Sequence, residues 1–172
     1  MSKTFRVMTV CTGNICRSPM AEIVLREAFA ANGLDADVVV DSTGVSGEEQ
    51  GNPVDRRARS VLSRHGYPAG DSHRARRVTT ADVAGHDLVL AMTAHHARAL
   101  RRLVRADGEG AEIRMFRSFD PEAPVLREGQ GEHLLDVEDP WYGGMEDFEV
   151  CLREIEAATP GIVEYVRERL AA

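Results

Sequence analysis

The chain has 172 residues, of which 43% are hydrophobic and 28% are charged, so it carries enough apolar material for one domain with a full core. Its formal net charge of -7 argues against sequence-independent binding to nucleic acids, which requires a basic surface. No apolar run reaches the length of a membrane span, and three cysteines are too few for a disulfide scaffold. We therefore expect one domain over residues 1–172, a cytoplasmic monomer that binds neither nucleic acid nor membrane.

Apolar runs alternate with helical patterns along the chain. Strands are predicted at residues 5–10, 37–41, 87–92 and 113–116, and helices at 19–31, 53–65, 94–104, 145–158 and 160–170. Short strands that alternate with helices predict an α/β fold with a parallel sheet and helices on both faces. The segment 118–139 has few periodic residues and several Gly and Pro, which predicts a long loop of functional interest.

The first predicted strand leads into a segment with the chemistry of an anion site. It reads Cys11-Thr12-Gly13-Asn14-Ile15-Cys16-Arg17-Ser18-Pro19. Ser18 and Pro19 are typical of an N-cap and a first helical turn, so the loop would open a helix. The unpaired N–H groups of that helix would bind an anion, and Arg17 adds a planar donor suited to phosphate oxygens. Cys11 would be a thiolate in this positive field, which indicates phosphoryl transfer through a thiol-phosphate.

This loop resembles the phosphate loop of the low-molecular-weight protein tyrosine phosphatases. A second motif resembles the acid loop of that family, and it reads Asp139-Pro140-Trp141-Tyr142. The order and spacing of the two motifs fit over nearly the whole chain. The resemblance implies a four-stranded parallel sheet with the phosphate loop at the carboxyl end of strand 1. It also implies hydrolysis of phosphotyrosine in protein substrates through a cysteinyl-phosphate, without metal or cofactor.

The two motifs assign catalytic roles to three residues. Cys11 would be the nucleophile, and Arg17 would bind two phosphoryl oxygens. Asp139 would protonate the leaving group and then activate water, and it is preferred over its neighbours Asp136 and Glu138 because it alone precedes proline. The Ser18 hydroxyl would bind the thiolate. The rest of the loop would bind phosphate, and its residues are Thr12, Gly13, Asn14, Ile15, Cys16 and Ser18.

Supporting roles follow for residues outside the loop. Asn14 fits a left-handed backbone position, and the resemblance ties it to Ser42 and His65. No histidine has a metal-ligand spacing with the cysteines, so no metal site is expected, and His95 and His96 are expected on a helix surface.

The substrate cleft is predicted from the residues that follow the acid. Trp141 and Tyr142 could wall a cleft for a phenolic ring, and packing within a turn is the alternative for one of them. Family members often place an aromatic residue in the rim loop at 45–50, whereas this chain has acidic residues such as Glu48. Acidic residues in place of an aromatic one would disfavour the binding of acidic peptides. Thr93 also stands where the family usually has aspartate.

The remaining cysteines receive separate predictions. Cys16 could trap an oxidised Cys11 as a disulfide, and simple packing under the loop is the alternative. Cys151 lies in an apolar helical stripe and is expected in the core.

Three other functions fit parts of the pattern. Arsenate reductases share the fold but need further cysteines, and only Cys151 is left, on a predicted buried face. Phosphoarginine phosphatases resemble this loop but carry threonine at the position of Ile15. A non-catalytic phosphate-binding module would keep Arg17 and lose Cys11 or Asp139. The complete set of residues favours a tyrosine phosphatase.

Overall fold

A computed structural model describes residues 3–104, 108 and 110–172, and the rest of the predicted domain over 1–172 lies outside the described residues. The strands are β1 (Phe5–Cys11), β2 (Val38–Gly44), β3 (Leu88–Ala91) and β4 (Glu112–Met115). The α-helices are α1 (Arg17–Ala31), α2 (Arg56–Arg64), α3 (Thr80–Gly85), α4 (Ala94–Arg101) and α5 (Met145–Ala171). The described residues also form three short 3-10 helices, which are η1 (Phe116–Phe119), η2 (Glu132–Leu135) and η3 (Pro140–Tyr142).

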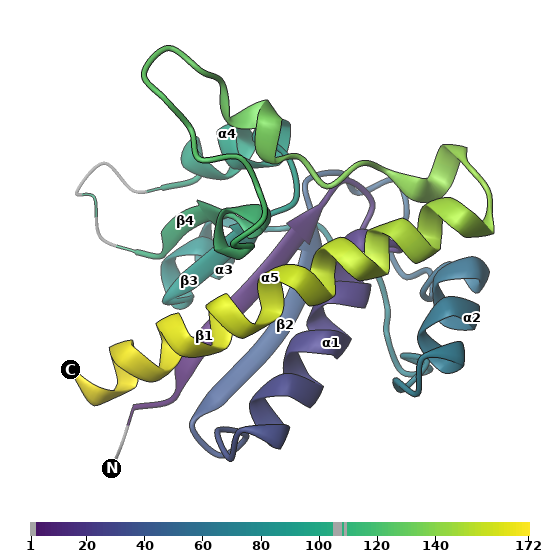
Figure 1. Cartoon of the computed structure of the whole chain (residues 1–172), viewed down its shortest axis with the longest axis horizontal. Coiled ribbons are helices and arrows are strands. Elements are labelled where there is room, and N and C mark those ends of the chain that lie inside the picture. The colour runs from purple at the N-terminus through teal and green to yellow at the C-terminus, as the bar shows by residue number, and fades with distance from the viewer. Residues whose placement is uncertain (1–2, 105–107, 109) are drawn as a thin grey trace.

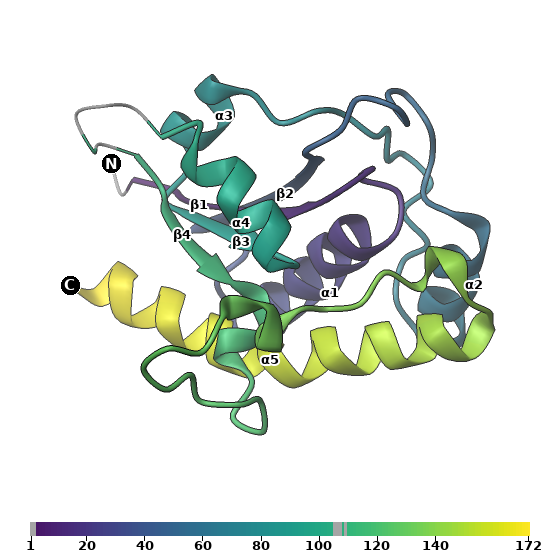
Figure 2. The same ribbon diagram turned by 90° about the horizontal axis from the view of Figure 1, so that it is seen from above.

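The four strands form one parallel sheet in the order β2-β1-β3-β4 (Figure 1). Alternate residues of β1 face opposite sides, so Val7 joins one hydrophobic cluster and Met8 joins another. The first cluster contains α1 and α5, and the second contains α3 and α4, so helices cover both faces (Figure 2). The predicted α/β fold class is confirmed.

Helix α1 begins earlier than the sequence indicates. Its first residue is Arg17, and the N-cap is Cys16, which makes no side-chain capping bond. The prediction of Ser18 as N-cap is therefore wrong. Because Ser18 lies inside the first turn, its hydroxyl is free to point toward the end of β1 instead of closing the helix.

The predicted helices at 145–158 and 160–170 are a single helix, α5, which continues through Pro160. A proline inside a helix costs about 3 kcal/mol because it removes one backbone hydrogen bond and crowds the preceding turn. Phe148, Ile155 and Val166 are fully buried along the same helix. Burial of each such side chain stabilises by about 1.5–3 kcal/mol, which together outweighs the cost of the proline.

Helix α3 is absent from the sequence prediction because six residues are too few to show a period. The start of α3 is fixed by a capping box. In it the Thr79 hydroxyl accepts from the Asp82 N–H, and the Asp82 carboxylate accepts from the Thr79 N–H. The predicted long loop at 118–139 likewise contains short elements, namely the end of η1 and the whole of η2.

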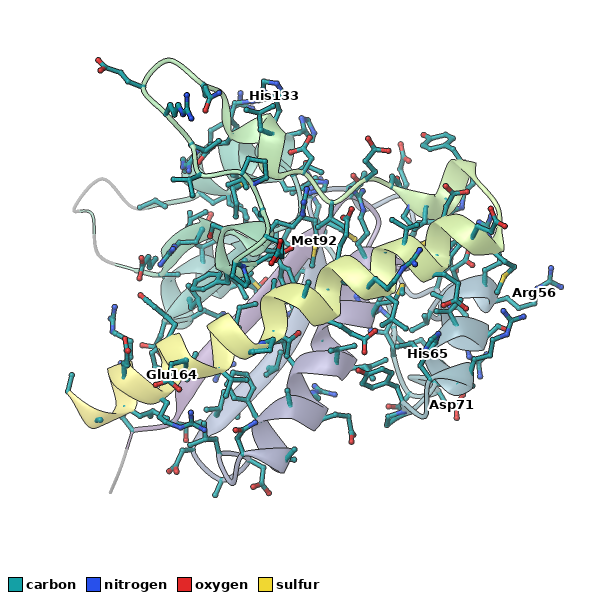
Figure 3. All side chains as sticks on the ribbon, in the orientation of Figure 1. Arg56, His65, Asp71, Met92, His133 and Glu164 are labelled. Atoms are coloured by element: carbon teal, nitrogen blue, oxygen red, sulfur yellow. The ribbon has the colours of Figure 1, made fainter. Side chains whose placement is uncertain are left out.

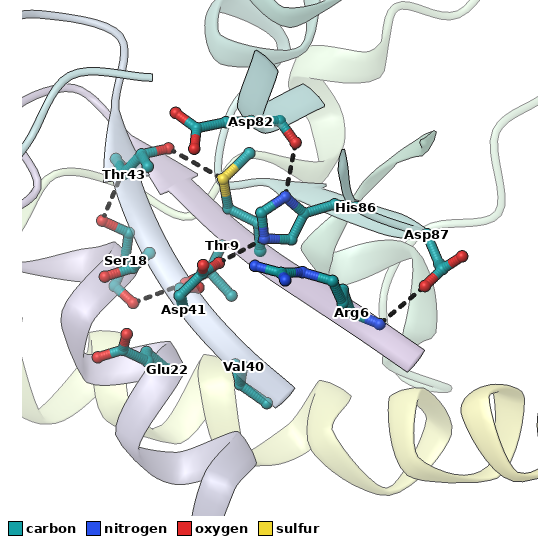
Figure 4. Close-up of polar contacts among 12 residues, drawn as sticks. Arg6, Thr9, Ser18, Glu22, Val40, Asp41, Thr43, Asp82, His86 and Asp87 are labelled. Carbon is teal, nitrogen blue, oxygen red and sulfur yellow. Dashed lines mark hydrogen bonds and ion pairs between the residues drawn. The ribbon is translucent and has the colours of Figure 1, made fainter. Parts of the chain in front are cut away.

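A polar cluster joins β2 to α1 and α3 (Figure 4). In it, buried His86 lies between two acceptors, the Asp41 carboxylate at 2.8 Å from Nε2 and the Asp82 carbonyl at 2.6 Å from Nδ1. Burial lowers the pKa of His86, but the hydrogen bonds to Asp41 and Asp82 outweigh it and raise the pKa above its usual value. The ring therefore favours the doubly protonated form, which donates to both neighbours.

Glu22 of α1 is only 7% exposed. Burial raises the pKa of Glu22 from 4.5 to about 7, against the lowering effect of the Arg26 charge. Because the folded chain holds this proton more tightly than the unfolded chain, the group stabilises the fold most below about pH 4.5. That stability is lost as the pH rises to about 7.

We expect Glu22→Gln to raise the free energy of unfolding by about 2 kcal/mol at pH 8 and by much less at pH 5. The amide keeps an oxygen to accept from Arg26, whose Nη2 lies 3.3 Å from the Glu22 carboxylate, and it cannot ionise. Urea unfolding at both pH values measures the difference. Equal changes at the two pH values would show that Glu22 is ionised throughout.

Candidate active site

The loop between β1 and α1 is built to surround an anion. Within the described part of the chain, no backbone carbonyl accepts a hydrogen bond from the N–H groups of residues 12–16. Asn14 has φ of 61°, which confirms the predicted left-handed backbone at this position. Successive free N–H groups next to a helix N-terminus form a concave site for negative charge.

This loop is the floor of an open pocket of about 160 Å³. Three segments that are distant in sequence line the pocket, namely the phosphate loop, the rim loop and the acid loop around η3. The lining residues are Cys11, Thr12, Gly13, Ile15, Cys16, Arg17, Glu48, Glu49, Asp139, Trp141 and Tyr142. The structure therefore brings the three predicted catalytic residues into one pocket.

The Cys11 thiol is buried, and its Sγ lies 3.0 Å from the Ser18 Oγ. Asn14 Nδ2 donates to the same Ser18 oxygen at 2.9 Å, and the Thr43 carbonyl lies 3.2 Å from it. A serine hydroxyl has one proton, so it donates to either the carbonyl or the sulfur. A thiolate cannot donate, and Ser18 then turns its proton to Cys11.

Arg17 is 4% exposed and is fixed from two sides. Its Nη1 donates to the Val137 carbonyl at 3.0 Å, and its Nη2 lies 3.3 Å from Asp139 Oδ2. Nε is buried without a partner among the described residues. An unpartnered buried N–H costs about 1–3 kcal/mol, and here it completes, with Nη2, a fork that suits two phosphoryl oxygens.

Asp139 stands at the N-terminus of η3, where its Oδ1 accepts from the Trp141 N–H at 3.1 Å. The two neighbouring carboxylates that could also serve as the general acid lie elsewhere. Asp136 accepts from the Ala94 N–H at 2.8 Å and so caps α4, and Glu138 does not line the pocket. Of these three carboxylates, Asp139 alone faces the phosphate loop, as the Asp-Pro pattern predicts.

The two walls of the pocket differ in chemistry. Trp141 and Tyr142 are 47% and 84% exposed, and their rings meet edge to face with centroids 4.9 Å apart. On the other side, Asn52 Nδ2 donates to the Glu49 carboxylate at 2.6 Å, and the methylene carbons of Glu49 lie next to Gly13. The cleft is therefore aromatic on one wall and acidic on the other. This agrees with the sequence of the rim loop at 45–50, which has acidic residues where family members often have an aromatic one.

The comparisons with known proteins bear on this geometry. The sequence profile of the family described as low molecular weight phosphotyrosine protein phosphatase matches residues 6–172. The chain belongs to this family. It is 45% identical over 167 residues to the low molecular weight protein-tyrosine-phosphatase of Streptomyces coelicolor, covering 97% of this chain and 96% of that protein.

Two further similarities extend over nearly the whole chain. The low molecular weight protein-tyrosine phosphatase A of Mycobacterium tuberculosis is 46% identical over 171 residues, covering 99% of this chain and 97% of the relative. A crystal structure of a protein tyrosine phosphatase from Entamoeba histolytica superimposes with a TM-score of 0.85 at 25% identity, covering 96% of this chain and 98% of that one. The predicted family is confirmed.

The supports of Asn14 are partly as predicted. Asn14 Nδ2 donates to the Ser42 hydroxyl at 3.0 Å, but the prediction for His65 is wrong. His65 lies on the side of α2 that faces α5, and its Nε2 is 2.7 Å from Glu149 (Figure 3). His73 takes the expected place and donates from Nε2 to the Asn14 carbonyl at 2.7 Å. Spacing in sequence does not distinguish the two histidines.

The prediction that His96 lies on a helix surface is also wrong, since the side chain is 1% exposed, whereas His95 is exposed as expected. Thr93 is the N-cap of α4, and its hydroxyl accepts from the His96 N–H at 3.3 Å. The family usually has aspartate at this position. Threonine and aspartate can both cap a helix N-terminus, so Thr93 can take over that role.

Cys16 and Cys151 are both buried and free. Burial raises the pKa of the Cys16 thiol, and the nearby negative groups Asp55 and Cys11 raise it further. Cys151 is 2% exposed, which confirms its predicted place in the core. Its burial likewise raises the pKa of the thiol. Both groups are therefore thiols at neutral pH.

The described residues lack two further features. No group of three or more His, Cys, Asp and Glu side chains there could hold a metal ion. Among the helices in the same residues, none is both long and apolar enough to cross a membrane.

Proposed function

We propose that this chain hydrolyses phosphotyrosine in protein substrates through a cysteinyl-phosphate intermediate. The observation that carries the proposal is the meeting of Cys11, Arg17 and Asp139 in one anion-binding pocket. The names of the relatives support the same activity. None of the steps below requires a metal or cofactor, and we propose none.

In the first step, the phosphate group of the substrate lies in the loop. Its oxygens accept from the free N–H groups and from Nε and Nη2 of Arg17. The Cys11 thiolate attacks phosphorus, and the bond from phosphorus to the phenolic oxygen breaks. Asp139 gives its proton to that oxygen, so that tyrosine leaves as a neutral phenol.

In the second step, the Asp139 carboxylate takes a proton from a water molecule that attacks phosphorus. The sulfur–phosphorus bond breaks, and inorganic phosphate leaves. The Ser18 hydroxyl donates to the Cys11 sulfur at this point, which stabilises the thiolate as a leaving group. Asp139 is protonated again, and the cycle can repeat.

The walls of the pocket support phosphotyrosine over other phosphoresidues. Trp141 and Tyr142 offer apolar ring surface above the loop, which a phenyl ring contacts and a serine side chain does not reach. Ile15 lines the pocket where a threonine hydroxyl would be needed to orient water for phosphoarginine. The acidic wall with Glu48 and Glu49 disfavours peptides with acidic residues beside the phosphotyrosine.

We expect phosphotyrosine peptides to be hydrolysed with a kcat/KM at least about tenfold above phosphoserine, phosphothreonine and phosphoarginine peptides with the same flanking residues. Phosphate release measures each rate. Trp141→Ala should lower the value for phosphotyrosine and leave the value for phosphoserine unchanged. Equal efficiency on phosphotyrosine and phosphoserine peptides would contradict the proposed cleft.

Cys16 is proposed to protect the nucleophile against irreversible oxidation. Peroxide converts the Cys11 thiolate to a sulfenic acid with loss of hydroxide. The Cys16 sulfur then displaces water and forms a Cys11–Cys16 disulfide, which a thiol reductant opens. Inorganic phosphate in the loop should slow the first reaction because it covers the Cys11 sulfur.

We expect mild peroxide to inactivate the enzyme reversibly, and Cys16→Ser to recover poorly with reductant. Cys151→Ser is the matched control, since it removes a buried thiol outside the loop and should recover as the wild type does. Peptide mapping by mass spectrometry identifies the linkage. A Cys11–Cys151 disulfide, or full recovery of Cys16→Ser, would rule out the protective role.

Partners and location complete the proposal. Phosphoproteins are the expected substrates of a member of this family. The monomeric state, the cytoplasmic location and the lack of nucleic-acid and membrane partners stay predictions.

A further inference from the structure

The ring of His96 is buried beneath the phosphate loop, and its tautomer is fixed by its neighbours. Nδ1 lies 3.2 Å from the backbone nitrogen of Thr93, and a backbone N–H can only donate. Nδ1 is therefore an acceptor, and the proton of the neutral ring is on Nε2. Burial lowers the pKa of His96 to about 3, helped by the charge of Arg17, so the ring is neutral at physiological pH.

The Nε2 proton of His96 points at Thr12, the residue after the nucleophile. The distance from Nε2 to Thr12 Oγ1 is 2.8 Å, so the hydroxyl oxygen accepts from the ring. Arg17 Nη2 is a second donor toward the same oxygen, at 3.5 Å. A hydroxyl has two lone pairs and one proton, and both lone pairs of Thr12 face donors.

The proton of the Thr12 hydroxyl is therefore left for an acceptor in the pocket. Among the described residues, His96 and Arg17 are the hydrogen-bond partners of this hydroxyl, and both act as donors. The Thr12 side chain lines the pocket beside the Arg17 Nη2, which is also the nitrogen that faces Asp139. The oxygens of a bound phosphoryl group are the acceptors that this part of the pocket would contain.

We propose that Thr12 is a further catalytic residue, whose hydroxyl donates to a phosphoryl oxygen, and that His96 is the positioning residue that aims it. The proposal rests on the phosphatase activity proposed above. In a phosphoryl-transfer transition state the negative charge spreads over the equatorial oxygens, so a donor fixed in advance stabilises it without reorganisation. His96 touches no substrate and acts only through Thr12.

Two pairs of variants test the hydroxyl and the ring separately. Thr12→Val removes the hydroxyl at nearly constant shape, and Thr12→Ser keeps it. His96→Gln places an amide nitrogen near the position of Nε2, whereas His96→Asn reaches only the position of Nδ1. His95→Asn is the matched control, because it changes the exposed neighbour and should behave as the wild type.

We expect Thr12→Val to lower kcat/KM for p-nitrophenyl phosphate about tenfold and to raise the inhibition constant of inorganic phosphate. His96→Asn should cause a similar loss, and His96→Gln and Thr12→Ser should restore most of the activity. The double variant Thr12→Val with His96→Asn should lose no more than Thr12→Val alone. Wild-type activity in Thr12→Val, or full additivity in the double variant, would overturn the proposal.

A spectroscopic measurement on the wild type does not depend on the folding of variants. Nitrogen-15 NMR of the histidine rings should show His96 protonated on Nε2 and not titrating between pH 5 and 8, and its signal should shift when inorganic phosphate is added. The opposite tautomer would overturn the proposal. Activity retained in Cys11→Ser would refute the phosphatase mechanism itself, whereas an unchanged Thr12→Val with an inactive Cys11→Ser refutes only this inference.

Discussion

Cys11→Ser is expected to abolish turnover of aryl phosphates, with a fall in kcat of about 10⁴-fold or more. The serine hydroxyl is a far weaker nucleophile than a thiolate at neutral pH, and the other sulfur at the floor of the pocket in the described structure is that of the buried, protonated Cys16. Serine fits the space of the buried cysteine. The free N–H groups and Arg17 do not change, so the variant should still bind phosphate.

Phosphate release from p-nitrophenyl phosphate measures the loss, and thermal unfolding with and without inorganic phosphate shows whether the anion site survives. Cys151→Ser is the control for the loss of a buried thiol, and it should retain activity. Substantial turnover by Cys11→Ser, in protein freed of wild-type enzyme, would exclude Cys11 as the nucleophile.

Asp139→Asn should reduce turnover by about 10²–10³-fold for substrates whose leaving group is a poor one, such as tyrosine. An asparagine cannot supply the proton that the phenolic oxygen needs as its bond to phosphorus breaks. The amide oxygen can still accept from the Trp141 N–H, so the start of η3 keeps its cap. Activated phenols leave without a proton, and their turnover should fall much less.

The measurement is the slope of log kcat against the pKa of the leaving phenol for a series of aryl phosphates. We expect a shallow slope for the wild type and a steep one for Asp139→Asn. Asp136→Asn is the matched control, since Asp136 caps α4 outside the pocket and should leave the slope unchanged. A slope that Asp139→Asn does not change would mean that another group supplies the proton.

The features that the sequence predicts well are those that neighbouring residues determine. The apolar run before Cys11 forms β1 because a central parallel strand is buried on both faces. The phosphate loop follows it directly, so Cys11, Asn14 and Arg17 are held by a short stretch of chain. The Asp-Pro pair likewise places Asp139 at the start of η3 by local hydrogen bonding.

The features that the sequence does not predict depend on contacts between distant segments. His73 supports Asn14 from an irregular segment, and no local pattern distinguishes it from His65. His96 is buried only because the N-terminus of α4 packs beneath Thr12, which hydrophobic periodicity does not reveal. Pro160 predicts a helix end, yet the buried face of α5 continues on both sides of it.

The hydrogen bond from Arg17 to the Val137 carbonyl joins residues 120 positions apart, and this has a consequence for biosynthesis. A ribosome adds about 5–20 residues per second, so the nucleophile loop is made about 6–24 s before the segment that anchors its arginine. Helix α5, which packs against α1, is made later still. A nascent chain therefore carries its nucleophile early and gains its acid late, and catalytic competence begins only after translation has passed α5.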